Sequence, residues 1–196
     1  MVFSTPGWPG VTPDCRGTLL ALFLALGMPE VLAQPTGIFI QQAQLERRED
    51  HEVLSADIDY RFPEVAIQAL NEGIPLGFMI RFSIDRPIFP GFRQTLFEES
   101  RHIQLRYLPL AKSYQVADLG TGAVQNFTNL MSVINTLRHL RGWEIKLPKD
   151  AQVSGTEASL SFRFDVEALP LPLRIEAYVT SAWRIQTGAY RWPNAP

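Results

Sequence analysis

Apolar and polar residues alternate along three stretches of this chain. From Leu54 to Phe62 every second residue is apolar and the residues between them are polar. Residues 78–85 and 158–167 repeat this pattern. A period of two places the apolar side chains on one face of an extended strand and the polar ones on the other. The pattern predicts three strands that each bury one face.

Residues 63–73 have the end signals of a short helix. Pro63 suits the first helical position, because the missing N–H would have no partner there. Gly73 accepts the left-handed conformation that commonly follows a helix. A helix is therefore expected between these two residues.

A stronger helix signal lies in residues 126–143, where apolar residues recur at helical spacing. Asn126 or Thr128 is expected to cap its start. Basic residues lie before Gly142, at the end that the helix dipole favours: Arg138, His139 and Arg141. This helix is expected to lie across a sheet.

The remaining segments are expected to be short strands. Two prolines and a glycine break the pattern in residues 86–92, and extended segments follow around Leu96 and in residues 103–107. Residues 112–119 are a further expected strand, closed by a glycine-containing turn.

The last part of the chain is also expected to be extended. Pro170 and Pro172 suit an edge or a crossover between sheets rather than a central strand. Residues 173–185 and 187–192 complete the pattern with two strands. The expected fold class is mainly β (α+β): an antiparallel β-sandwich of about 7–8 strands with two short covering helices.

An apolar run near the start, residues 18–33, resembles an export signal. Arg16 precedes it, and Val31 and Ala33 stand at the positions of small residues before a cleavage site. Pro29 and Glu30 interrupt the run before the roughly 20 apolar residues that span a bilayer.

We therefore expect residues 1–33 to be an N-terminal extension and signal peptide, and residues 34–196 to form a single β-sandwich domain in the periplasm. An uncleaved signal that tethers the domain to the inner membrane is the alternative. A true start later than Met1 is also left open, because residues 1–13 are rich in proline and glycine.

Cysteine usage and charge exclude several classes of function. Cys15 is the only cysteine and lies in the expected leader, so the rest of the chain has no disulfide, thiol nucleophile or zinc–thiolate site. The formal charge is −2, and the leader contains one basic and two acidic residues, so the domain has a charge near −1. Nucleic-acid binders usually have a basic excess, and we expect no nucleic-acid partner.

The chain also resembles a family. It resembles the domain-of-unknown-function family 4390, exported proteins of Gram-negative bacteria, in five strings between about residue 38 and residue 192: ALNEGIPLGF, RQTLFEES, RHIQLRYLPLAKSYQV, TLRHLRGWEI and SAWRIQTGAYRW. The resemblance implies an envelope location and a β-rich domain, and it brings no catalytic residues. Genes of this family often lie near that of a membrane sensor kinase, which implies such a protein as a partner.

No constellation of catalytic or metal-binding residues stands out. The G-x-S-x-G motif of α/β-hydrolases is absent, and the three histidines have no telling spacing. Asp57 and Asp59 share a strand face and Glu98 is followed by Glu99, but solvated strands commonly carry such pairs. We expect no catalytic, cofactor-binding or metal-binding residues and no cofactor.

The candidate residues are instead those of an interaction surface. Trp, Tyr and Arg dominate interface hot spots, and five of them gather near the C-terminus: Trp183, Arg184, Tyr190, Arg191 and Trp192. Packing of these aromatics in the core is the alternative. A second candidate is the proline-broken stretch that contains Ile88, Phe89 and Phe92.

These observations predict a non-enzymatic envelope protein that acts through protein contact, as an interaction or sensor-associated accessory domain. The alternative is a carrier of an apolar or lipid ligand between the sheets. A hydrolase is a remote alternative. The protein is expected to contact the membrane only if the signal is uncleaved.

Overall fold

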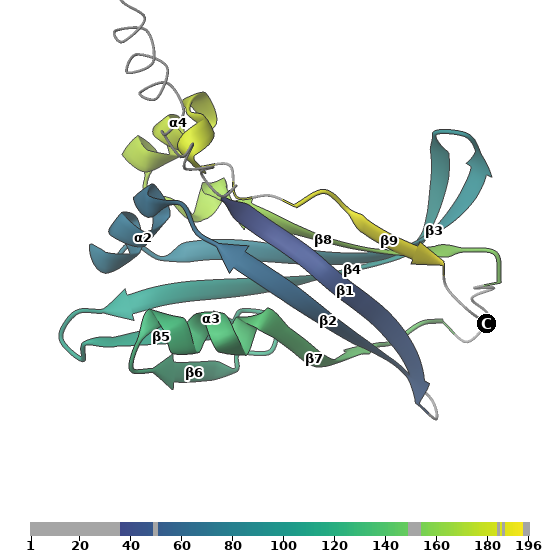
Figure 1. Ribbon diagram of the computed structural model, residues 1–196, viewed down its shortest axis with the longest axis horizontal. Coiled ribbons are helices and arrows are strands. Elements are labelled where there is room, and N and C mark those ends of the chain that lie inside the picture. Colours follow the sequence, from purple (N-terminus) through teal and green to yellow (C-terminus); the bar gives the residue numbers. More distant parts are fainter. Residues whose placement is uncertain (1–35, 49–50, 149–153, 184, 186, 194–196) are drawn as a thin grey trace, which may run out of the picture. The chain divides into compact units, whose positions relative to one another are not determined.

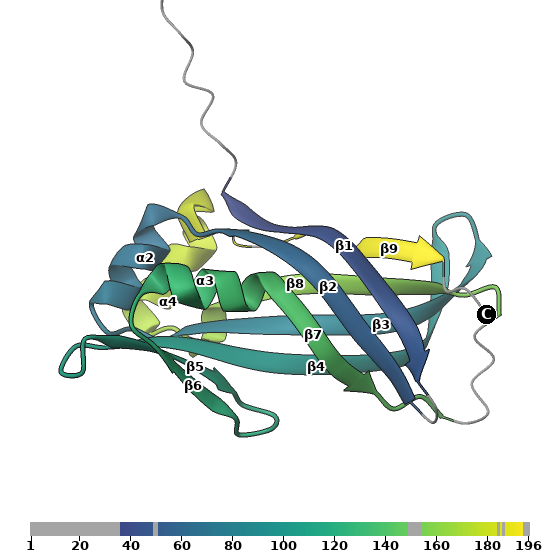
Figure 2. The same ribbon diagram turned by 60° about the horizontal axis from the view of Figure 1, so that its bottom comes forward.

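The computed structural model describes residues 36–48, 51–148, 154–183, 185 and 187–193. All of them belong to one unit of the chain, Pro35–Pro196. They form two antiparallel sheets that face each other, together with three α-helices (Figures 1 and 2). The expected export signal lies outside the described residues and stays a prediction.

The first sheet has three strands in the order β1 (Gly37–Arg48), β2 (His51–Arg61) and β7 (His139–Ile145). β1 and β2 pair along their whole lengths, and β7 pairs with the other edge of β2. The alternation predicted for β2 is confirmed, since its apolar side chains from Leu54 to Tyr60 are buried and the residues between them are half-exposed.

The second sheet has six strands in the order β6-β5-β4-β3-β8-β9. Their bounds are Val124–Phe127 (β6), Ser113–Asp118 (β5), Phe92–Leu108 (β4), Leu76–Phe89 (β3), Glu157–Asp165 (β8) and Tyr190–Pro193 (β9). The predicted strands at residues 78–85 and 158–167 are thus β3 and β8, which pair with each other in the middle of the sheet, although β8 ends at Asp165 and the next three residues form a 3-10 turn.

The core lies between the two sheets. β2 contributes Leu54 and Ile58, β3 contributes Phe82, and β8 contributes Leu160, all with 1% exposure or less. Full burial of one such leucine, isoleucine or phenylalanine stabilises a fold by about 1.5–3 kcal/mol. The period-two pattern therefore predicts correctly which faces of these strands meet.

The described residues contain three α-helices: α2 (Glu64–Asn71), α3 (Leu130–Arg138) and α4 (Leu171–Val179). Two 3-10 turns, η1 (Val166–Ala168) and η2 (Ser181–Trp183), lie before and after α4. α2 confirms the first predicted helix, with Gly73 at a φ of 85° just beyond its end, but Pro63 is its extended N-cap residue and not its first helical residue. No helix in the described part of the chain is both long enough and apolar enough to cross a membrane.

The second predicted helix is shorter than expected. Asn129, rather than Asn126 or Thr128, caps α3 by accepting a 2.8 Å hydrogen bond from the backbone N–H of Ser132. The helix ends at Arg138, because the residues that follow pair with β2 as strand β7. Gly142, at a φ of 67°, lies where the β2–β7 register shifts, so it serves a strand irregularity and not a helix end.

Two other expectations are wrong. Residues 86–92 do not end the strand pattern, since β3 and β4 continue through them as a hairpin that turns at Gly91. Residues 171–179 form α4 and not a strand, because Pro172 in the first helical turn costs no hydrogen bond. No strand was predicted for residues 37–48, which form β1. With β1 included, the described residues contain nine strands.

The helices α2 and α4 lie at the end of the sandwich where β1 begins (Figures 1 and 2). Gly37 at the start of β1 pairs with Arg61 at the end of β2, and α2 follows directly. α2 in turn contacts η2, which follows α4. The β3–β4 hairpin projects from the opposite end.

Candidate functional site

The C-terminal aromatic cluster divides into core and rim. Trp183 retains 2% exposure, and its indole stacks on Phe164 with ring centroids 5.7 Å apart. This side chain therefore corresponds to the core-packing alternative and offers no surface. Arg184 lies outside the described residues.

Strand β9 turns its aromatic residues inward. Tyr190 and Trp192 are opposite the buried Leu160 and Ala158 of β8, and both are half-buried. The ring of Trp192 lies 6.3 Å from that of Phe82, centroid to centroid. Of the described members of the cluster, Arg191 alone is exposed, so the structure does not gather them into one surface patch.

The second candidate stretch forms a projecting arm, defined here as residues 86–96 of β3 and β4. The pairing of β3 with β8 stops at Asp85, so beyond this point β3 and β4 pair only with each other. Ile88, Phe89 and Phe92 at its tip are 62%, 54% and 61% exposed. Phe89 and Phe92 stack across the turn with centroids 4.2 Å apart. The arm thus holds three large apolar side chains in solvent.

Asp85 fixes the base of the arm. Its carboxylate is buried and accepts hydrogen bonds from the hydroxyls of Ser83, at 2.8 Å, and Thr95, at 2.7 Å. The β3–β4 register shifts between Ile84 and Asp85, which leaves Leu96 as an additional residue in β4. Such an irregularity bends a strand pair, and the carboxylate ties both strands together at the bend.

A groove opens between the two sheets on the side of β7. On the opposite side β1 approaches β9, which closes the sandwich there (Figures 1 and 2). Two adjoining hollows of about 290 and 460 Å³ share Arg101, Asp118 and Thr121. The first has an apolar part formed by Ile80, Ile103, Val116, Leu137 and Leu140. We call the two hollows together the inter-sheet groove.

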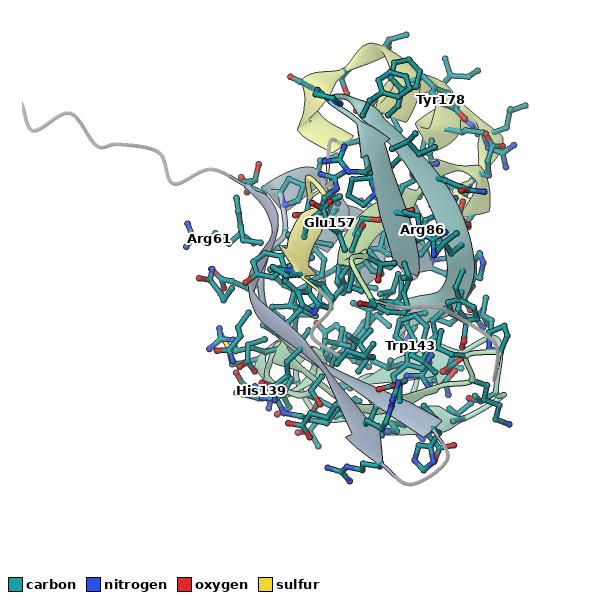
Figure 3. The ribbon with its side chains drawn as sticks, turned by 90° about the vertical axis from the view of Figure 1, so that its right-hand side faces the viewer. Arg61, Arg86, His139, Trp143, Glu157 and Tyr178 are labelled. Carbon is teal, nitrogen blue, oxygen red and sulfur yellow. The ribbon has the colours of Figure 1, made fainter. Side chains whose placement is uncertain are left out.

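Charged residues lie on the inner face of the second sheet within this groove. Arg101 forms a 2.8 Å ion pair with Asp118, and its guanidinium lies 5.3 Å from the ring centroid of Trp143. The indole Nε1 of Trp143 donates a 3.0 Å hydrogen bond to Glu99. Figure 3 shows Trp143 in the interior, between the sheets. Arg101, Asp118 and Glu99 each have a partner, so this part of the groove contains no unpaired charge.

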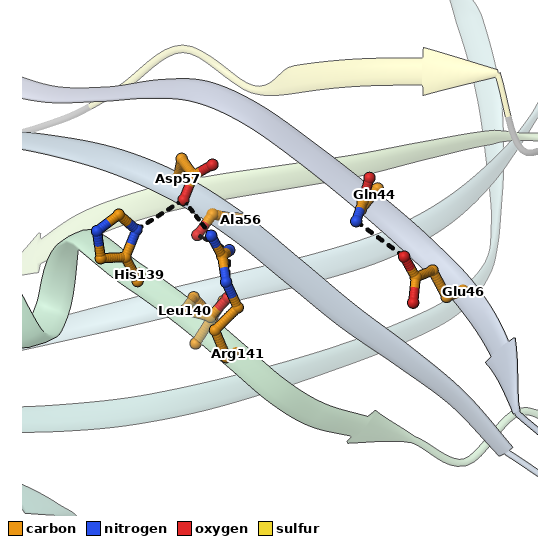
Figure 4. Close-up of polar contacts among 7 residues, drawn as sticks. All are labelled: Gln44, Glu46, Ala56, Asp57, His139, Leu140 and Arg141. Atoms are coloured by element: carbon orange, nitrogen blue, oxygen red, sulfur yellow. Dashed lines mark hydrogen bonds and ion pairs between the residues drawn. The ribbon is translucent and has the colours of Figure 1, made fainter.

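A second polar cluster lies on the outer face of the first sheet (Figure 4). Asp57 accepts from Arg141 at 2.5 Å and lies 2.8 Å from Nδ1 of His139. The hydrogen bonds from His139 and Arg141 lower the pKa of Asp57 below its ordinary value of 3.8. Asp59 pairs with Arg61 at 2.8 Å. The two carboxylates thus serve separate ion pairs.

The other residues considered for catalysis have structural partners or lie apart. Glu98 pairs with Arg81 and Glu99 accepts from Trp143, so these neighbours point to opposite faces of β4. His102 is exposed on the face of β4 away from the core. No group of three metal-ligating residues occurs within the described ranges.

Sequence patterns did not reveal the inter-sheet groove. Arg101, Asp118 and Trp143 come from three different strands, and their approach depends on the pairing of those strands. One local signal existed: Glu99 and Arg101 interrupt the apolar face of β4, between Phe97 and Ile103. Charges on an inward face indicate either a partner across the core or an opening to water.

No curated protein and no solved structure matches this chain. The profile of a family described as a domain of unknown function, DUF4390, matches residues 36–193, which include every described strand and helix. The match covers well over half of the chain and agrees with the resemblance seen in the sequence. The chain belongs to the DUF4390 family.

Proposed function

We propose that this protein is a non-enzymatic envelope domain that acts by protein contact, with the tip of the β3–β4 arm as its contact surface. The observation that carries the proposal is the exposure of Ile88, Phe89 and Phe92. They lie on a two-stranded extension of β3 and β4 that projects beyond the pairing of β3 with β8. The partner is an envelope protein, and the resemblance favours a membrane sensor kinase.

The tip of the arm has no evident role in the stability of the domain. Its tip residues bury little surface in the chain itself, whereas the core is complete without them. Exposed apolar side chains in a cluster are typical of interaction sites, because their burial against a partner supplies binding energy. The buried carboxylate of Asp85 fixes the base of the arm, which lowers the entropy lost on binding.

The test is site-specific photocrosslinking in the cells that make the protein. A photoreactive residue in place of Phe92 is expected to capture one discrete partner. The variant with Phe89→Ser and Phe92→Ser is expected to bind that partner with an affinity that is lower by about tenfold or more. A matched control carries Leu119→Ser and Val124→Ser, since both of these residues are also exposed.

Both double variants should unfold in urea as the parent does, because they change exposed side chains. Equal capture from position 92 and position 119, or unchanged partner binding by the arm variant, would contradict the proposal.

A second candidate, binding of a small apolar ligand, is favoured by the apolar part of the inter-sheet groove. The first hollow of the groove, which contains this apolar part, has a volume of about 290 Å³, at the lower end for ligand sites, which span about 300–1,000 Å³. Native mass spectrometry of the purified protein should then show added ligand mass, and Ala123→Trp, in the wall of the groove, should remove it. The same substitution at the exposed Thr128 is the control. A parent protein without added mass would count against this candidate.

A further inference from the structure

Helix α4 has an apolar face that the domain does not cover. Leu171, Ile175, Tyr178 and Val179 are 65%, 59%, 64% and 78% exposed. Their spacing places them on one side of the helix. Unlike the tip of the arm, this surface is a continuous helical stripe, and it lies at the opposite end of the sandwich (Figures 1 and 2).

The other side of α4 is firmly attached to the domain. Leu173 and Ala177 pack against the core. Arg174 donates hydrogen bonds to the backbone oxygens of Glu167 and Leu169, at 2.5 and 3.0 Å, and pairs with the carboxylate of Glu167. The hydroxyl of Tyr178 donates to the same carboxylate. The helix is therefore held with its apolar stripe outward.

The position of α4 indicates what covers this stripe. β1 begins at Gly37, at the end of the sandwich where α4 lies. The apolar run of residues 18–33 ends four residues before Gly37, a stretch that spans at most about 14 Å. If that run stays in a bilayer, the stripe of α4 is held next to the lipid surface.

We propose that the apolar face of α4 docks on a lipid bilayer, beside the point at which the apolar segment 18–33 joins the domain. The stripe contains no charged residue, so apolar burial rather than attraction to anionic lipids drives the contact. A nine-residue helix alone binds lipid weakly, and two signals are needed for stable attachment. The adjoining segment provides the second signal by raising the local concentration of lipid.

The experiment uses the full chain with Cys15→Ser, reconstituted in phosphatidylcholine vesicles, with an environment-sensitive fluorophore on Val179→Cys. The fluorescence is expected to shift to the blue and to be quenched by lipids that carry a quencher in their acyl chains. The same fluorophore on Gln94→Cys in the arm is the control, and no lipid-dependent change is expected there. Added phosphatidylglycerol or salt should alter neither result.

Leu171→Glu with Ile175→Glu should abolish the lipid-dependent shift at position 179. Met131→Glu, at a residue of α3 that is 62% exposed, is the matched control and should preserve it. A blue shift without lipid quenching would show that the stripe is covered by protein, either the segment 18–33 or a second copy of the chain. This result would overturn the proposal. Absence of any shift, or recovery from cells of only a chain that lacks residues 1–33, would overturn it as well.

Discussion

At the scale of single residues, most charged side chains on the strands serve as partners for neighbours. Asp57, His139 and Arg141 form a cluster on the outer face of the first sheet, although 82 positions separate Asp57 from the histidine. The sequence shows Asp57 as one of two carboxylates on a strand face, and it could not show the basic residues that β7 brings beside it. Their pairing changes a candidate acid–base group into an ion pair.

The lowered pKa of Asp57 predicts a pH dependence of stability. Because the pKa is lowered in the folded state, the ionised carboxylate stabilises the fold above pH 3.8, and this contribution is lost as the pH falls through the folded-state pKa. The side chain is 36% exposed, so Asp57→Asn should lower the free energy of unfolding by at most about 1 kcal/mol at neutral pH.

The difference between the parent and the variant at neutral pH should shrink at an acid pH well below 3.8, as the carboxylate becomes protonated in the folded parent. Urea unfolding at the two pH values measures it, with Glu176→Gln on α4 as an exposed control that should show no such pattern. A difference that persisted unchanged into acid would show that the substitution acts by another route.

At the scale of elements, the sequence predicts the central strands well and helix α4 poorly. β2, β3 and β8 each have one face toward the core and a more polar face on the other side. That asymmetry produces the alternation of apolar and polar residues from which these strands are predicted. In α4, by contrast, Leu173 and Ala177 face the domain while Ile175 and Val179 face out. Apolar residues on both sides of this helix produce an alternation that imitates a strand. The exposed stripe is thus the reason that the prediction failed.

The arm is the element whose geometry depends most on one residue. Asp85→Ala would leave the hydroxyls of Ser83 and Thr95 without their acceptor at the base of the arm. The substitution should lower the free energy of unfolding by about 1–3 kcal/mol. It should also speed amide hydrogen exchange in residues 86–96, because the β3–β8 pairing stops at Asp85 and the backbones beyond the bend pair only with each other.

Gln94→Ala changes an exposed residue of the same arm and should affect neither measurement. If exchange in the arm of the Asp85 variant matched that of the parent, the strand pairing alone would define its orientation.

At the scale of the whole molecule, the sequence predicts the class of fold but not the sites. The two-sheet arrangement follows from strands with single buried faces. The inter-sheet groove depends on which sides of the sandwich close: β1 approaches β9 on one side, while β7 leaves the other side open over Arg101 and Asp118. No local pattern contains that information, because the edges involved are far apart in the chain.

The last described strand, β9, completes an edge of the second sheet and lies beside β1, the first described strand. Two of the seven described strand pairs, β2–β7 and β3–β8, also join a segment made early with one made late. Such topologies fold slowly, since distant segments must meet before their contacts compensate for the lost chain entropy. During synthesis the edge of β3 that pairs with β8 stays unpaired until residues 157–165 emerge. An unpaired strand edge in a half-made chain invites pairing with other chains, so such a chain is prone to aggregation.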